Sequence, residues 1–278
     1  MVLHSFLPRI FFASLFSFLS IFRVFSLSPK TEKIIDGFLI LHAELTASKS
    51  NEEARTKIEK YALEAEIPEE DAEQGTLILN SLRLMEAESY LLESDDKKAR
   101  NRAFGEQMRL NENFISAHEK DGSVSKWLYL FTGDVTSYYM TRSVASTLRH
   151  GMRVKKLYEL ALSVDPLLTN ANINIGNWFF YAPRVFGGGL SKAGDCYEIA
   201  QLGARTKGER YMSALFLSQF YFCSKKSAEC EKYLKEAEKE VPESAEIARV
   251  RRLNAAGISL FQYNRTKSGV DEHQEDED

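Results

Sequence analysis

Residues 169–200 read TNANINIGNWFFYAPRVFGGGLSKAGDCYEIA. Apolar residues recur at three- and four-residue spacing on both sides of a break that holds one proline and three consecutive glycines. Such spacing places apolar side chains on one face of an α-helix, whereas proline and glycine interrupt helices. The stretch therefore predicts a helical hairpin, in which an enlarged loop connects a helix ending near Tyr181 to a second helix starting near Leu190.

The three consecutive glycines raise the alternative of a phosphate-binding loop. In nucleotide-binding proteins that loop has the pattern G-x-x-x-x-G-K-[ST] between a strand and a helix, so that backbone N–H groups surround the phosphate. Here Gly189 is followed by Leu190 and Ser191, and the preceding segment has helical spacing. We therefore interpret the glycines as a tight turn between helices, and keep anion binding at the N-terminus of the second helix as the alternative.

The hairpin is one copy of a repeat. The second helix of each copy carries an aromatic residue or leucine, and an alanine three positions later. The copies are offset by 39 and 37 residues, and the aligned positions are Tyr158, Ala161 and Pro166, then Tyr197 and Ala200, then Leu234, Ala237 and Pro242. On the first helices, small residues occupy matched positions, Gly176 in one copy and Ser218 in the next. Small residues let two helices approach, and aromatic rings are expected to fill the gap between neighbouring hairpins.

This pattern resembles the tetratricopeptide repeat, in which L-G-x-x-Y is followed by A-x-x-x-F and then by proline. Residues 211–244 fit its 34-residue period without insertion, whereas the copy that begins at Thr169 needs extra residues between its helices. Weaker earlier copies are carried by Ala87, Tyr90, Ala99 and Ala103, and by Gly133 with Tyr158. The resemblance implies an all-α fold of helical-hairpin repeats, arranged as a right-handed α-solenoid or a helical bundle.

Composition divides the chain into four parts. We expect a signal peptide or N-terminal anchor at 1–28, packing helices at 29–75, the repeat region with a C-terminal capping helix at 76–262, and a disordered acidic tail at 263–278. The capping helix is expected to run from Ala245 to Gln262, because apolar and arginine side chains alternate there with helical spacing. No segment alternates apolar and polar residues between turn signals, so no sheet is expected.

The segment before residue 29 predicts export. The apolar run from Ile10 to Phe22 would rise only about 20 Å as a helix, which is short of a hydrocarbon core of roughly 30 Å and is typical of a signal peptide. Val24 and Ser26 suit cleavage after Ser26, and an uncleaved anchor is the alternative. The cysteines, Cys196, Cys223 and Cys230, lie too late in the chain for a lipid-modified N-terminus, so no lipobox is present.

Charge and motifs argue against several functions. A net charge of −4 gives no general attraction to nucleic acid, and the local basic cluster is interpreted as a solvated helix face. That cluster consists of Arg142, Arg149, Arg153, Lys155 and Lys156. The five histidines are scattered without the i, i+4 pairing of a zinc helix, and no G-x-S-x-G motif occurs. We therefore expect no enzymatic activity, no metal, no cofactor and no nucleic-acid partner.

A helical-repeat array usually binds its partner on a concave face, which the first helix of each hairpin lines. The register places five residues on that face: Asn170, Asn177, Tyr181, Gln219 and Phe222. Amides beside aromatic rings suit an extended peptide or a small polar ligand. The alternative is that Tyr181 and Phe222 are core residues between hairpins.

The central loop carries a closer resemblance. Its order of an aromatic run, APRVFGGG and SKAGDCYEIA is similar to the signature of the T component associated with tripartite ATP-independent periplasmic (TRAP) transporters, where an A-P-x-x-x-G-G insertion separates the helices of one hairpin. The residues that carry it are Ala182, Pro183, Gly187, Gly188, Lys192 and Ala193. Members of that family are commonly lipoproteins, and the missing lipobox cysteine is a departure from it.

The resemblance implies a periplasmic scaffold that binds the solute-binding protein of such a transporter, forms a ring-shaped homo-oligomer and contains a ligand cleft or pore. Two other functions fit the same residues. One is a generic tetratricopeptide-repeat scaffold for protein–protein interaction in the cell envelope. The other is a carrier for a small apolar or acidic ligand.

Overall fold

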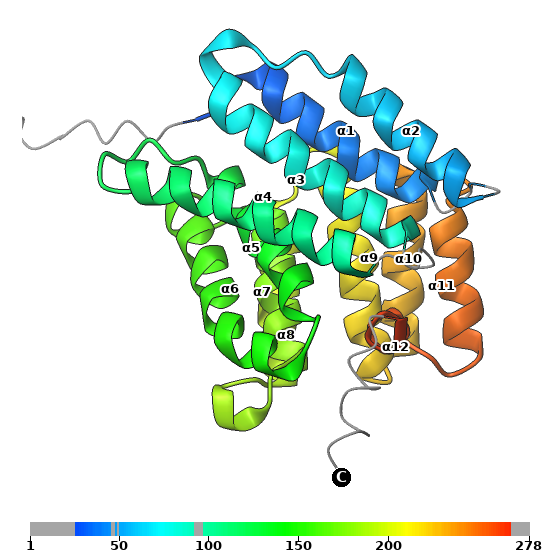
Figure 1. Cartoon of the computed structure of the whole chain (residues 1–278). Helices are drawn as coiled ribbons and strands as arrows, with labels where there is room; N and C mark the ends of the chain where they lie inside the picture. Colours follow the sequence, from blue (N-terminus) through cyan, green and yellow to red (C-terminus); the bar gives the residue numbers. More distant parts are fainter. Residues whose placement is uncertain (1–25, 46–47, 49, 92–96, 268–278) are drawn as a thin grey trace, which may run out of the picture.

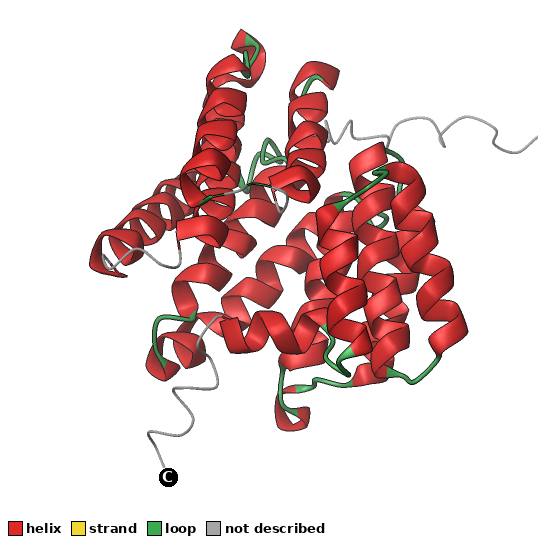
Figure 2. Ribbon diagram, turned by 90° about the vertical axis from the view of Figure 1, so that its right-hand side faces the viewer, coloured by secondary structure: helices red, strands yellow, loops and turns green. Residues whose placement is uncertain are grey.

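The computed structural model describes residues 26–45, 48, 50–91 and 97–267. Across these residues the chain forms α-helices and two short 3₁₀ helices, with no strand, so the predicted all-α fold is confirmed (Figures 1 and 2). The elements are α1 (Pro29–Leu45), α2 (Asn51–Glu64), η1 (Glu69–Asp71), α3 (Ala72–Leu91), α4 (Lys97–His118), α5 (Lys126–Met140), α6 (Val144–Val164), α7 (Thr169–Tyr181), η2 (Arg184–Phe186), α8 (Leu190–Gly203), α9 (Lys207–Cys223), α10 (Ser227–Glu240), α11 (Ala245–Ala255) and α12 (Leu260–Lys267).

Three helical hairpins form the repeat array. They are the pairs α5 with α6, α7 with α8, and α9 with α10, and the members of each pair pack most extensively against one another. Helices α1 to α4 lie obliquely across one end of this array (Figure 1). The earlier repeat copy predicted around Ala87 and Ala103 falls on α3 and α4, but α3 contacts α2 and α5 more than it contacts α4.

One glycine–tyrosine contact occurs in two of the hairpins. A Cβ atom added to Gly133 of α5 would lie 2.5 Å from the ring of Tyr158 on α6, and one added to Gly176 of α7 would lie 2.8 Å from the ring of Tyr197 on α8. Tyr158 is almost completely buried and Tyr197 completely so. In these two hairpins, small and aromatic residues of the predicted register therefore pack directly against each other. The rings lie between the two helices of one hairpin, whereas they were expected between neighbouring hairpins.

The hydroxyl groups of the same tyrosines make equivalent hydrogen bonds. Tyr158 donates to Asp134 Oδ1 at 2.8 Å, and Tyr197 donates to Asn177 Oδ1 at 2.7 Å. In both hairpins the acceptor directly follows the glycine that receives the ring. A buried phenol hydroxyl needs a hydrogen-bond partner, and the side chain that follows the glycine supplies it in both hairpins.

Several helices begin at a side-chain cap. Ser50, Ser125, Ser143 and Ser244 each accept a hydrogen bond from the backbone N–H three residues later. Thr206 forms a full capping box with Glu209 at the start of α9. These side chains satisfy donors that have no partner inside the helix, and so fix where the array helices start.

The folded body begins before residue 29. Leu27 belongs to the main hydrophobic core, and Ser28 donates to Asp71 Oδ2 from both its backbone N–H, at 2.9 Å, and its hydroxyl, at 2.6 Å. The expected boundary between leader and body at residue 28 therefore falls two residues too late. The rest of the predicted leader lies outside the described residues.

The C-terminal end differs from the predicted single capping helix Ala245–Gln262. The chain turns at Gly257, whose φ of +79° suits glycine, and continues as the separate helix α12. The predicted tail 263–278 is also wrong at its start, because α12 extends through Lys267. Residues 268–278 lie outside the described part of the chain.

The glycine–tyrosine contact predicts opposite effects for two glycine-to-alanine substitutions. Gly176→Ala should lower the free energy of unfolding by roughly 1–3 kcal/mol, because the new methyl group overlaps the Tyr197 ring. Gly151→Ala should raise it by roughly 0.5–1 kcal/mol, because a Cβ at this α6 position meets nothing within 4 Å and alanine favours a helix. Urea unfolding of both variants measures the difference. Equal effects would contradict the register.

Candidate functional site

The five residues predicted to line a concave binding face lie on α7 and α9, the first helices of their hairpins. Two of them already have structural roles. Asn177 accepts the Tyr197 hydroxyl described above. Asn170 is 8% exposed, and its Oδ1 has no hydrogen-bond partner among the described residues. Asn170 is thus buried, whereas Asn177 stays partly exposed.

Helix α12 covers the other part of this face. Gln219 is fully buried, and its Oε1 accepts the backbone N–H of Leu260 at 2.8 Å. Tyr181 donates its hydroxyl to the backbone oxygen of Phe261 at 2.9 Å. Gln219 was predicted to face a ligand, and that prediction is wrong for this structure because the chain's own C-terminal helix occupies the position.

The side chain of Phe261 fills an aromatic pocket on the same face. Its ring centroid lies 4.5 Å from that of Phe180, 5.7 Å from that of Tyr197 and 6.0 Å from that of Phe216. Phe222 is only partly buried and packs beside the cluster formed by α9, α10 and α11. Tyr181 and Phe222 thus pack in part between elements, but neither is a fully buried core residue, and Tyr181 stays 41% exposed.

The loop between α7 and α8 is built by the residues of the predicted family signature. Pro183 precedes the single turn of η2, and Gly187 follows it with a φ of +92°, a conformation that suits glycine. A Cβ atom on Gly188 would lie 1.8 Å from the carbonyl oxygen of Ala182, so no other residue fits there without rearrangement. The backbone N–H of Gly189 donates to the backbone carbonyl oxygen of Phe179 at 2.9 Å and closes the loop onto α7.

The remaining signature residues anchor the loop to α8. Lys192 Nζ donates to the carbonyl oxygen of Gly187 at 3.0 Å, and Ala193 in the first turn of α8 is completely buried. This lysine also lies over the ring of Phe179, with its Nζ 5.6 Å from the ring centroid. The loop is thus held by hydrogen bonds at both ends, and its lysine is used in the turn itself.

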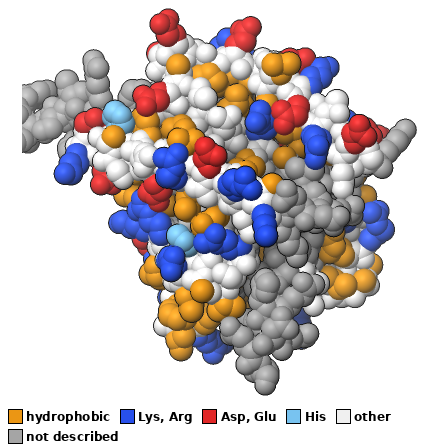
Figure 3. Space-filling view, in the orientation of Figure 1, with side chains coloured by type: hydrophobic (Ala, Val, Ile, Leu, Met, Phe, Trp, Pro, Cys, Tyr) orange, Lys and Arg blue, Asp and Glu red, His pale blue; other side chains and the backbone are white. Residues whose placement is uncertain are grey.

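The tip of this loop exposes apolar side chains. Val185 is 86% exposed and Phe186 57%, and Leu190 at the start of α8 is exposed as well. Hydrophobic atoms gather at the lower left edge of the molecule, where the loop projects (Figures 1 and 3). We call Val185, Phe186 and Leu190 the apolar tip. The sequence pattern alone did not single out these residues, because their exposure depends on the turn geometry.

Asp134 is the most strongly perturbed carboxylic acid of the array. Burial raises the pKa of Asp134 to about 7, although the hydrogen bonds that its Oδ1 accepts from Tyr158, at 2.8 Å, and from Asn174, at 2.6 Å, act to lower it. The group sits between α5, α6 and α7, where it serves the repeat packing. Burial within the repeat packing is enough to account for the raised pKa of Asp134, so the shift does not by itself indicate a catalytic role.

The described part of the chain has no cluster that suits a metal ion and no helix that suits a membrane span. No group of three or more histidine, cysteine, aspartate or glutamate residues there could hold a metal ion. Cys196, Cys223 and Cys230 are free thiols. None of the helices in the described ranges is long and apolar enough to cross a membrane.

Comparison with known proteins adds no family. No protein-family model matches the chain, and no curated protein matches it either. The resemblance to the TRAP-associated family therefore rests on the signature residues of the α7–α8 loop alone.

The raised pKa of Asp134 predicts a pH-dependent stability. A carboxyl group that binds its proton more tightly in the folded state stabilises the fold fully below about pH 4, and this contribution is lost as the pH rises through about 7. Asp134→Asn should therefore raise the free energy of unfolding by roughly 1–3 kcal/mol at pH 8 and change it little at pH 4. Asparagine already accepts the tyrosine hydroxyl at the matching position 177.

Urea unfolding at both pH values tests this expectation. The matched control is Asp195→Asn, which removes an exposed carboxylate from α8 and should give the same small difference at both pH values. A gain for Asp134→Asn that is equally large at pH 4 would contradict the assignment.

Proposed function

We propose that this protein is a helical-repeat scaffold that binds another protein through the apolar tip of the α7–α8 loop. The observation that carries the proposal is the combination of a fixed backbone and exposed apolar side chains. The glycines, Lys192 and the Gly189–Phe179 hydrogen bond hold the turn, while Val185 and Phe186 extend from it. Exposed contiguous apolar side chains of this kind mark interaction sites in soluble proteins.

The energetics favour docking at the tip. Burying a valine or phenylalanine side chain is worth about 1.5–3 kcal/mol, and a rigid loop loses little conformational entropy when it binds. An aromatic anchor at the centre of an interface is a common energetic hot spot. The exposed side chain of Arg184 lies next to the tip in sequence and would suit the polar rim of such an interface.

The signature resemblance supports a particular partner. We propose that the scaffold acts in the periplasm, where its partner is the solute-binding protein of a TRAP-type transporter, and that it does so without catalysing a reaction. A ring of several copies would place several tips on one assembly. The alternative, a generic envelope scaffold, uses the same apolar tip but binds a different protein.

A small-ligand carrier has less support on the face first expected to bind. There α12 occupies the groove over α7 and α9, with Phe261 in the aromatic pocket. The proposed function therefore places recognition at the outer loop instead of the groove.

Export predicts a defined N-terminus. Cleavage after Ser26 leaves Leu27 and Ser28, which the core and Asp71 hold in place, whereas cleavage after Ser28 would remove both. The intact mass of protein purified from the periplasm should therefore correspond to a chain that begins at Leu27. A full-length mass would indicate the uncleaved anchor, and recovery in the cytoplasm alone would contradict export.

The docking proposal is tested by crosslinking. A photoreactive phenylalanine analogue at position 186 should form a crosslink to the solute-binding protein in cells that contain the transporter. Phe186→Asp should weaken that complex by about tenfold or more, because it places a charge where an apolar side chain would be buried. Leu63→Asp on α2 is the matched control, since Leu63 is also open to solvent, at 88% against 57% for Phe186, but lies elsewhere.

The outcomes separate the candidate functions. Crosslinks to a different envelope protein would support the generic scaffold and reject the transporter partner, and crosslinks between copies of this chain would support the ring. Equal loss of binding in Phe186→Asp and Leu63→Asp, or no specific crosslink from position 186, would reject docking through the apolar tip.

A further inference from the structure

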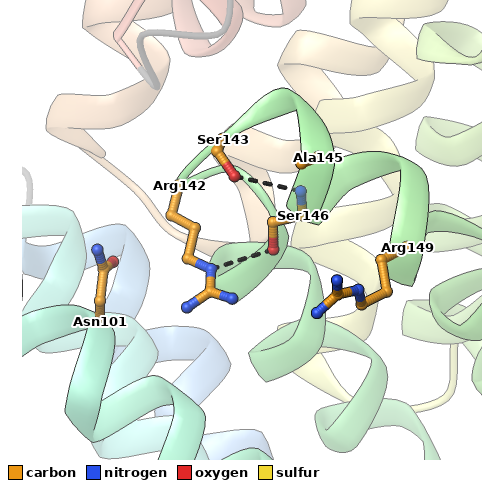
Figure 4. Close-up of a pocket in the computed structure, with 6 residues that line it drawn as sticks. All are labelled: Asn101, Arg142, Ser143, Ala145, Ser146 and Arg149. Carbon is orange, nitrogen blue, oxygen red and sulfur yellow. Dashed lines mark hydrogen bonds between the residues drawn. The ribbon is translucent and has the colours of Figure 1, made fainter.

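A cavity of about 310 Å³ opens between α4 and the first turns of α6. Its described lining consists of Asn101, Arg142, Ser143, Ala145, Ser146 and Arg149, none of which is acidic. The guanidinium groups of Arg142 and Arg149 extend toward the same space, and Asn101 faces it from α4 (Figure 4). From the sequence these arginines were expected on a solvated helix face, whereas the structure places Arg142 and Arg149 in the lining of a cavity.

Arg142 is held in position by its neighbours. Its Nε donates to Ser146 Oγ at 3.2 Å, and its guanidinium carbon lies 3.8 Å from the centre of the Tyr139 ring. These contacts use one N–H and one face of the group, and they leave its two terminal nitrogens directed into the cavity (Figure 4). A guanidinium fixed in this way has already lost the side-chain freedom that binding would otherwise cost.

Within the described ranges, neither Arg142 nor Arg149 forms an ion pair with an acidic side chain. Glu112 of α4 pairs instead with Arg153, through both of its carboxylate oxygens. Burial, together with the charges of Arg142 and Arg149, lowers the pKa of the neighbouring His150, whereas Glu112 acts weakly in the opposite direction. The positive field of the two arginines therefore prevails around the cavity.

The first turn of α6 adds polar groups of the matching sign. Ser143 caps the helix, and its hydroxyl accepts the backbone N–H of Ser146 at 3.2 Å. The N–H groups at the beginning of a helix have no partner within it and carry the positive end of the helix dipole. A helix N-terminus alone is common, but here it contributes to a hollow that already contains two guanidinium groups.

We propose that this cavity binds a phosphate group. Planar guanidinium forks match the oxygens of phosphate in bidentate fashion, and the hydroxyl, amide and helix N–H groups supply further donors. Two sources of the group fit the surface. Leu148 and Met152, which are 69% and 58% exposed on the same helix, would contact the acyl region if the phosphate belonged to a lipid headgroup, and would remain in water if it belonged to a soluble phosphate ester.

The experiment measures binding to the full chain in two arms. In the soluble arm, calorimetric titration uses inorganic phosphate and glycerol phosphate. In the lipid arm, sedimentation uses phosphatidylcholine vesicles with and without phosphatidic acid. We expect saturable binding in at least one arm, with a dissociation constant of roughly 0.1–1 mM for the soluble ligands.

Two cavity variants and a control make the assignment specific. Arg142→Gln and Arg149→Gln should each weaken binding by about tenfold or more, because each removes a charge-assisted donor pair. Arg149→Lys should recover part of the affinity, since it restores charge without the planar fork. Arg252→Gln removes an exposed arginine from α11 and should leave binding unchanged. Thermal unfolding of each variant confirms that it is folded.

The outcomes decide both the site and the source. Binding in the soluble arm that depends on Arg142 and Arg149 supports a free phosphate ester, and binding only to phosphatidic acid vesicles with the same dependence supports a lipid headgroup. Equal weakening by Arg252→Gln, or no binding in either arm up to about 10 mM phosphate, would overturn the proposal. None of these results depends on the apolar tip, so the two proposals fail or succeed separately.

Discussion

The position of α1 across the repeat array is the constraint on which the rest of the structure depends. The carboxylate of Asp36 accepts the backbone N–H of Gly208 at the start of α9, from 172 positions away in the sequence. A Cβ atom on Gly208 would lie 2.6 Å from that of Leu39, so only glycine allows the two helices to approach this closely.

A charged cluster also ties α1 to two other helices. His42 of α1 lies between Glu86 of α3 and Glu246 of α11. The charge of Glu86 raises the pKa of His42 well above its ordinary value. Burial acts to lower this pKa, and the charge of Glu246 raises it further.

This arrangement explains why the array has no open groove where one was expected. Helix α1 contacts α9 and α11, and α12 covers α7 and the second half of α9, so both ends of the described chain pack on the first helices of the hairpins. Apolar surface that a longer array would offer to a partner is buried within the molecule. The two recognition sites that we propose, the apolar tip and the arginine-lined cavity, both lie outside this face.

The sequence predicted the parts of the fold that arise from local patterns. Gly176 and Tyr197 belong to one hairpin, and their spacing was enough to predict the repeat register and a close helix approach at Gly176, although not that the ring would lie inside the hairpin. The placement of α12 could not be read in the same way, because it depends on Phe261 meeting rings from three other helices. The candidate site shows the same division. The signature glycines indicated a turn, but the exposure of Val185 and Phe186 follows from the three-dimensional path of that turn.

The contacts of α1 also set an order of events during synthesis. This helix is translated early, and most of its apolar side chains, among them Ile35, Phe38 and Leu45, pack in the main core with residues of α2 to α7. Ile40 and Ala43 instead pack with residues of α9 to α12, which are made last. Contacts between distant segments form late, because the loop between them must close first. The chain therefore cannot complete this second cluster until nearly all of it has been made, and until then part of α1 stays unburied. A chain that completes its packing this late suits the proposed export, in which it would be threaded through a narrow channel before it folds.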